Sequence, residues 1–132
     1  MDILENNILN IKKDLETILN RNPENVRKAI KEIYHGMREL YGEGFVKMYL
    51  FGSRARGDFD EYSDIDLFLL TTYDKDKIKD LRRKKIKITS KIDLEYLTLT
   101  MVLEDTLNNF EEWKNYKGLY KSILSEGVEL IG

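Results

Sequence analysis

Residues 52–66 read Gly-Ser-Arg-Ala-Arg-Gly-Asp-Phe-Asp-Glu-Tyr-Ser-Asp-Ile-Asp, and this stretch decides the fold. One apolar run ends at Phe51, directly before Gly52-Ser53, and another begins within Asp64-Ile65-Asp66. The pattern predicts two strands joined by a turn and a loop, with polar side chains where the strands meet the connection. Because alternate residues of a strand share a face, Asp64 and Asp66 are expected to point the same way.

Two carboxylates on one face repel each other, and a divalent cation between them relieves the repulsion. Mg²⁺ prefers such oxygen ligands and completes its shell with water and substrate phosphates. Gly52 lets the backbone approach a phosphate closely, and Ser53 offers a hydroxyl. An aspartate at the start of a strand often only caps a turn, which is an adequate account of Asp64 alone. Asp66 lies one residue deeper, where an unpaired carboxylate costs on the order of several kcal/mol, so it needs a partner.

Further charged residues are candidates for the same site. Arg54 and Arg56 place positive charge next to Gly52-Ser53, although either is also compatible with a solvated surface position. Metal-assisted transfer to a hydroxyl needs a base or a third ligand as well. Asp93 is the best candidate, because it is predicted to lie in a third strand between apolar neighbours. Glu95 shares its face and is the rival, since strand register cannot be read from the sequence.

The composition limits the classes of protein that the chain can belong to. Its 132 residues, 42% hydrophobic and 35% charged, suit one domain with one core. Basic and acidic residues number 22 and 24, a balance that does not favour direct nucleic-acid binding. There are no cysteines and His35 is the only histidine, which excludes disulfides, thiolate metal sites and two-histidine sites. No secretion signal or membrane-length apolar run is seen, so a soluble cytoplasmic protein is expected.

Apolar periodicity predicts helices around a small mixed sheet, which is an α/β or α+β domain. The expected helices cover residues 2–20, 23–41, 74–85, 100–110 and 113–125, with a helical turn at 53–56. The expected strands cover residues 45–51, 65–72 and 91–98, with an edge strand at 128–131. Asn22-Pro23 is expected to begin the second helix, with asparagine as N-cap and proline at the first helical position.

Taken together, Gly52-Ser53, ten intervening residues and Asp64-Ile65-Asp66 resemble the signature of the minimal nucleotidyltransferases of the DNA polymerase β superfamily. The resemblance is strongest over residues 45–70. It extends to Asp93 and, more loosely, to residues 123–128. It implies a polymerase-β-like fold, ATP as substrate, two Mg²⁺ ions, and transfer of a nucleoside monophosphate with release of pyrophosphate.

The same resemblance implies a role for each matching residue. Gly52 and Ser53 match the phosphate-binding pair, with Arg54 and Arg56 beside it. Asp64 and Asp66 match the metal-binding aspartates. Asp93 matches the third carboxylate, which binds metal and assists deprotonation of the accepting hydroxyl.

Small members of this family resemble the antitoxin of two-gene modules whose toxin is a HEPN-type ribonuclease. Such antitoxins attach AMP to a tyrosine of the toxin. The chain fits this size class but carries an extension, roughly residues 1–20, ahead of the usual first helix. This resemblance implies a HEPN-type protein partner and is compatible with a homo- or hetero-oligomer.

Three hypotheses remain open on the sequence alone. The first is an active nucleotidyltransferase that adenylylates a partner protein. The second is transfer to a small molecule such as an aminoglycoside, although no acceptor-binding domain is apparent. The third is a protein that neutralises its partner by binding alone, which the amphipathic N-terminal helix motivates.

Overall fold

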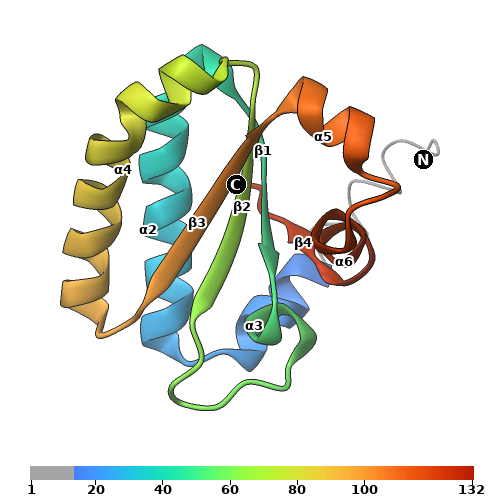
Figure 1. Ribbon diagram of the computed structural model, residues 1–132. Coiled ribbons are helices and arrows are strands. Elements are labelled where there is room, and N and C mark those ends of the chain that lie inside the picture. The colour runs from blue at the N-terminus through green and yellow to red at the C-terminus, as the bar shows by residue number, and fades with distance from the viewer. Residues whose placement is uncertain (1–13) are drawn as a thin grey trace, which may run out of the picture.

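The structure is a computed structural model, and it describes residues 14–132 (Figure 1). Its centre is a four-stranded sheet in the order β3-β2-β1-β4. The strands are β1 (Phe45–Phe51), β2 (Ile65–Thr71), β3 (Thr100–Thr106) and β4 (Val128–Glu129). β1 pairs antiparallel with β2 and β4, whereas β2 and β3 run parallel. The expected mixed sheet is therefore confirmed.

Helices cover both faces of this sheet. The two long helices, α2 (Glu24–Tyr41) and α4 (Lys75–Tyr96), lie side by side on one face, and α5 (Leu107–Trp113) and α6 (Gly118–Glu126) lie on the other (Figure 1). Two short helical segments flank β1, namely the 3₁₀ turn η1 (Gly42–Gly44) before it and α3 (Ser53–Arg56) after it. Residues 14–21 are also helical.

The main core lies between the sheet and the two long helices. β1 and β2 contribute alternate residues to this core, as the two-residue period of a strand requires. The central positions are completely buried: Ala29, Ile33, Met37, Met48, Leu50, Leu67 and Leu69. A smaller core lies on the opposite face, where Phe68 and Leu70 of β2 contact side chains of α5 and α6. Asp66 stands on this second face, because it is two residues before Phe68.

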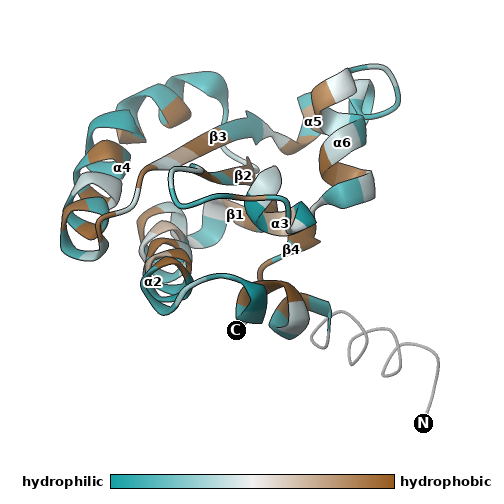
Figure 2. Ribbon diagram, turned by 90° about the horizontal axis from the view of Figure 1, so that it is seen from below, coloured by the Kyte–Doolittle hydropathy of each residue, from teal (hydrophilic) through white to brown (hydrophobic). Residues whose placement is uncertain are grey.

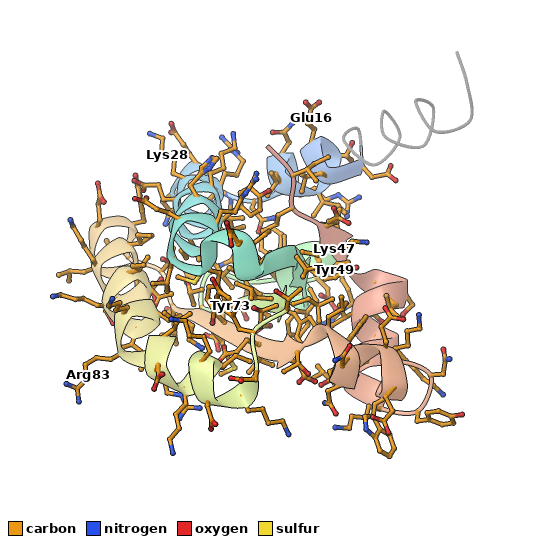
Figure 3. The ribbon with its side chains drawn as sticks, turned by 90° about the horizontal axis from the view of Figure 1, so that it is seen from above. Glu16, Lys28, Lys47, Tyr49, Tyr73 and Arg83 are labelled. Atoms are coloured by element: carbon orange, nitrogen blue, oxygen red, sulfur yellow. The ribbon has the colours of Figure 1, made fainter. Side chains whose placement is uncertain are left out.

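The outer surface of α4 is charged. Figure 2 shows its exposed turns as largely hydrophilic, and in Figure 3 Arg83 projects from the helix away from the sheet. The exposed helix predicted at residues 74–85 is confirmed and runs one residue short at its start but eleven further at its end, to Tyr96. Within residues 14–132, no helix has the length and apolar character needed to cross a membrane.

The prediction of a strand at residues 91–98 was wrong. These residues continue α4 to Tyr96, because Leu81, Ile88 and Ile92 keep a helical spacing and pack toward the core. The alternation of Ile92, Leu94 and Tyr96 suggested a strand only by coincidence, since Leu94 is 80% exposed. The third strand is instead β3, in the stretch predicted as helix 100–110, of which only residues 107–110 are helical.

The beginning of the second helix also differs from the prediction. α2 starts at Glu24, and Pro23 occupies the N-cap position without a side-chain cap. The Asn22 side chain turns inward and donates hydrogen bonds to the carbonyl oxygens of Ile18 (3.1 Å) and Arg54 (3.0 Å). Leu15 and Leu19 are buried in the main core. Residues 14–22 are therefore part of the packed domain, whereas the rest of the predicted helix 2–20 lies outside the described residues.

Candidate active site

The turn after β1 places Gly52 directly against the Asp66 carboxylate. Gly52 has a φ of +72°, a conformation that side chains rarely adopt, and a Cβ at this position would overlap Asp66 Oδ2. Its carbonyl oxygen accepts hydrogen bonds from the backbone N–H groups of Ala55 (3.1 Å) and Arg56 (3.0 Å). These bonds form the first turn of the short helix α3. The sequence predicted a turn here because Gly52-Ser53 directly follows the apolar residues of a strand.

Asp66 stands among apolar neighbours on its face of the sheet. In the register of the strands it pairs with Phe51 of β1 and Met101 of β3. Burial raises the pKa of the Asp66 carboxyl, and the negative charge of Asp64 raises it further, while Arg56 acts in the opposite direction. The negative charge of Asp64 therefore disfavours the ionised form of Asp66, and the pair gains from any cation placed beside it.

Ser53 is half-buried at the start of α3. Among the interactions of residues 14–132, no hydrogen bond uses its hydroxyl, so this group is free to contact a ligand. Gly57 ends α3 with a φ of +94°. The predicted helical turn at residues 53–56 and its closing glycine are thus confirmed.

Arg56 places positive charge near the pair from an exposed position. Its guanidinium forms ion pairs with Asp58 and with Glu126 of α6, each at 3.3 Å. It also acts on the Asp66 pKa, as noted above. The arginine therefore connects the turn to α6 while remaining exposed.

Arg54, by contrast, is 4% exposed and lies inside the loop that joins α3 to β2. Its Nη2 donates a hydrogen bond to the Ser63 carbonyl oxygen (3.0 Å), and its guanidinium carbon lies 4.6 Å from the centre of the Phe59 ring. Its Nε and Nη1 have no hydrogen-bond partner within the described chain. Burial lowers the pKa of Arg54, while Asp60 raises it. Arg54 thus supports the loop that leads into Asp64.

Asp93 does not reach the aspartate pair. It lies near the end of α4, where its carboxylate accepts hydrogen bonds from the Thr98 hydroxyl (2.7 Å), the Thr100 hydroxyl (2.7 Å) and the Thr100 N–H (3.0 Å). Thr100 pairs with Ile65, so its side chain is directed to the α2 and α4 face of the sheet, opposite to that of Asp66. The rival Glu95 is exposed on α4.

A metal site here has to be completed by a ligand. Within residues 14–132, no group of three or more histidine, aspartate or glutamate side chains is arranged to hold a cation. Asp64 and Asp66 are nevertheless suitable for a Mg²⁺ ion that takes its remaining oxygens from water and phosphates, which is how Mg²⁺ is usually bound with nucleotides. The Ser53 hydroxyl, which has no hydrogen-bond partner among residues 14–132, is available to a phosphate bound beside the pair.

A cavity of about 370 Å³ lies next to this site rather than over it. The start of α2, the loop before β2 and the turn after α4 line it, and its residues include Arg54, Tyr62, Ser63 and Leu97. Neither aspartate of the pair contributes to its lining. The cavity therefore lies beside the aspartate pair and is not itself the candidate site.

Sequence reasoning missed two features of the site. The first is Met101, which was assigned to a helix and is in fact the β3 neighbour of Asp66. The second is the support of the turn by the N-terminal segment, in which Asn22 bonds to Arg54 and Arg21 Nη1 approaches the Arg56 carbonyl oxygen at 3.5 Å. An asparagine before a proline suggested only a cap, and no local signal indicated a contact 32 residues away.

Comparisons of the sequence with known proteins found a family model and two relatives. The family model described as "Nucleotidyltransferase domain" matches residues 30–130. The chain is 32% identical over 103 residues to "Putative protein adenylyltransferase MJ0604" of Methanocaldococcus jannaschii, covering 78% of this chain and 95% of the relative. It is 33% identical over 93 residues to "Putative protein adenylyltransferase MJ0141" of the same organism, covering 67% and 92%.

A solved structure shares the fold. The match is to a crystal structure of a mutant of the toxin-antitoxin MntA-HpeT, with a TM-score of 0.50 and 18% sequence identity. It covers 77% of this chain and 72% of that one. At this level of identity the likeness concerns the arrangement of helices and strands.

Proposed function

The chain belongs to the nucleotidyltransferase domain family and is a nucleotidyltransferase of the minimal, polymerase-β-like type, and from this premise we propose that it transfers AMP from ATP to a hydroxyl of a partner protein. The observation that carries the proposal is the contact of Gly52 with Asp66, beside Asp64 and the free Ser53 hydroxyl. Because glycine has no Cβ, the backbone of the turn lies directly against a carboxylate of the pair.

The proposed reaction is an in-line displacement at the α-phosphorus of ATP. The acceptor oxygen bonds to this phosphorus, the bond to the bridging oxygen of the β-phosphate breaks, and pyrophosphate leaves. Gly52 and Ser53 would hold the phosphates, and Asp64 and Asp66 would hold Mg²⁺, which would supply positive charge to neutralise the triphosphate. Arg56 adds positive charge from the exposed side. Arg54 acts through the loop, since its buried guanidinium holds the segment that ends in Asp64.

A protein acceptor is favoured by two observations. Both relatives named above carry names that describe protein adenylyltransferases, and 95% and 92% of their lengths are covered, so they have little room for an additional acceptor-binding domain. The partner we propose is a HEPN-type ribonuclease toxin, modified on a tyrosine, with the chain acting as its antitoxin. The toxin-antitoxin neighbour with the same fold supports this setting.

The proposal is tested by incubating the chain with ATP, Mg²⁺ and the protein encoded by the neighbouring gene. Intact-mass spectrometry should show the partner gaining the mass of AMP, and peptide mapping should place it on a tyrosine. Asp66→Asn should abolish the gain. Asp80→Asn makes the same chemical change on the exposed surface of α4 and should leave the yield unchanged.

Other outcomes would select another function. Unchanged yield with Asp66→Asn would reject the assignment of the site. Neutralisation of the partner that survives substitution of both Asp64 and Asp66 would show that binding alone is sufficient. AMP transfer to an aminoglycoside in the absence of any protein would assign a small-molecule acceptor instead.

A further inference from the structure

The position beside Asp66 on the neighbouring strand is occupied by Met101. In the parallel ladder of β2 and β3, Asp66 pairs with Met101, and paired residues of adjacent strands direct their side chains to the same face. Leu103, two residues further along β3, packs with Phe68 in the smaller core. Met101 therefore points to the same face of the sheet as Asp66. A carboxylate at position 101 would therefore stand next to Asp66. Methionine offers a thioether, a poor ligand for the hard cation Mg²⁺.

Most other acidic side chains near the turn are engaged elsewhere. Asp58 and Glu126 are paired with Arg56, and Asp60 accepts hydrogen bonds from Tyr62 N–H and from the Ser63 hydroxyl. Asp93 is held by threonines on the opposite face of the sheet.

Asp105 shares the face of Met101 but stands four residues further along β3. It is buried and accepts hydrogen bonds from the Tyr120 hydroxyl and from Asn109 Nδ2. Glu61 is therefore the remaining acidic candidate in the loop before β2, where it is exposed.

From these contacts we propose that Met101 leaves the site one carboxylate short, so that an acidic side chain of the acceptor protein, beside its accepting hydroxyl, completes it. The inference rests on the proposed function and specifies its substrate class. In the transfer step the acceptor's own carboxylate takes the hydroxyl proton as the oxygen bonds to the α-phosphorus and pyrophosphate leaves. Asp64 and Asp66 bind only the metal–nucleotide complex.

The first test counts metal ions and needs no turnover. Mn²⁺ binding in the presence of a non-hydrolysable ATP analogue is measured by electron paramagnetic resonance. The wild-type chain should bind one Mn²⁺ per bound nucleotide, and Met101→Asp should bind a second. Met101→Asn, whose side chain has the shape of aspartate without the charge, should bind one Mn²⁺ per nucleotide like the wild type. Because Met101 is 51% exposed, neither change disturbs the core.

The second test uses two tyrosine peptides that differ only in having glutamate or glutamine beside the tyrosine. Wild-type transfer should favour the glutamate peptide by on the order of 10²-fold, the usual contribution of a positioned base. Met101→Asp should remove this preference by raising transfer to the glutamine peptide. Glu61→Gln should change neither rate.

The outcomes separate this inference from the function on which it rests. A second Mn²⁺ in the wild type, equal use of both peptides, or loss of transfer in Glu61→Gln would overturn the inference and leave the proposed function standing. Absence of any Mn²⁺–nucleotide binding by the wild type would reject both.

Discussion

At the residue scale, the site depends on a backbone conformation that only glycine adopts easily. Gly52 has a positive φ and is in contact with the Asp66 carboxylate. Gly42 also has a positive φ, of +52°, but a Cβ at that position would have no atom within 4 Å. Gly42 and Gly52 thus both have a positive φ but differ in their surroundings.

Gly52→Ala should destabilise the fold by about 1–3 kcal/mol through backbone strain and further through overlap with Asp66. Gly42→Ala should be destabilised by the backbone strain alone. Urea denaturation and ATP-analogue binding, measured on both variants, separate the two contributions. We expect nucleotide binding to be lost in Gly52→Ala alone. Equal effects of the two substitutions would contradict the close approach of the turn to Asp66.

Asp66 provides a second prediction at this scale. Burial and Asp64 raise its pKa above that of the unfolded chain, so between the ordinary and the raised value the folded state binds more protons. Stability therefore falls as the pH rises through this window, and the penalty persists at neutral pH. Asp66→Asn removes it and should raise the Tm at pH 7, without metal, by roughly 1–3 °C.

This gain should disappear in acid, below the ordinary aspartate pKa, where Asp66 is protonated in both folded and unfolded chains. Thermal melts at pH 7 and in acid test the difference. A lower Tm for Asp66→Asn at pH 7 would show that the carboxylate stabilises the fold and would contradict the raised pKa. Addition of Mg²⁺ and an ATP analogue should stabilise only the wild type.

At the scale of elements, a shielded ion pair fixes α4 against β3. Lys85 forms an ion pair with Glu104, with side chains only 11% and 10% exposed, and it donates a further hydrogen bond to the Val102 carbonyl oxygen (2.9 Å). β3 is the strand that places Met101 beside Asp66. The position of this edge strand thus depends on a charged contact with a helix.

Lys85→Met should cost about 3–5 kcal/mol, because Glu104 would remain charged and poorly solvated. Combining it with Glu104→Leu should restore most of the stability, since the double variant carries no uncompensated charge. The free energies of unfolding of the wild type, the two single variants and the double variant give the coupling free energy between Lys85 and Glu104. Lys114→Met, in the exposed pair with Glu111, should cost less than about 1 kcal/mol. Additive effects of the two core substitutions would contradict the pairing.

At the scale of the whole molecule, the segment before α2 closes the domain around the turn. Asn22 is buried, and its amide connects the helix over residues 14–21 with the turn through bonds to Ile18 and Arg54. Its Oδ1 has no hydrogen-bond partner among the described residues. Residues 18–22, at the end of the stretch that the sequence suggested as an extension, therefore support the turn directly.

Asn22→Ala should destabilise the fold by about 1–3 kcal/mol, because the Arg54 carbonyl oxygen loses its partner in a buried position. It should also weaken binding of an ATP analogue through the loosened turn. Asn25→Ala removes a comparable hydrogen bond to the Tyr96 carbonyl oxygen at an exposed position and should have little effect on either. Calorimetric titration of both variants checks the comparison, and equal affinities would show that the turn does not depend on Asn22.

The sequence by itself determined the strands β1 and β2, the glycine turn after β1 and the spacing of the two aspartates, as well as the family. Each of these depends on neighbouring residues, through alternation of apolar side chains, glycine conformation and the spacing of carboxylates. Ile65 to Thr71 could be recognised as a strand because nearly every residue of it is apolar.

Only the tertiary structure decided which side chain of the third strand stands beside Asp66 and which distant residues hold the turn. Met101, and not the predicted Asp93, lies beside Asp66, because α4 continues to Tyr96. The apolar residues near its end fit both the spacing of a helix and the alternation of a strand, so the sequence alone does not distinguish the two. The burial of Ile92 and the exposure of Leu94, which the packing of α4 on α2 and the sheet imposes, select the helix. Strand register and contacts between distant segments are properties of that packing, and no short stretch of sequence contains them.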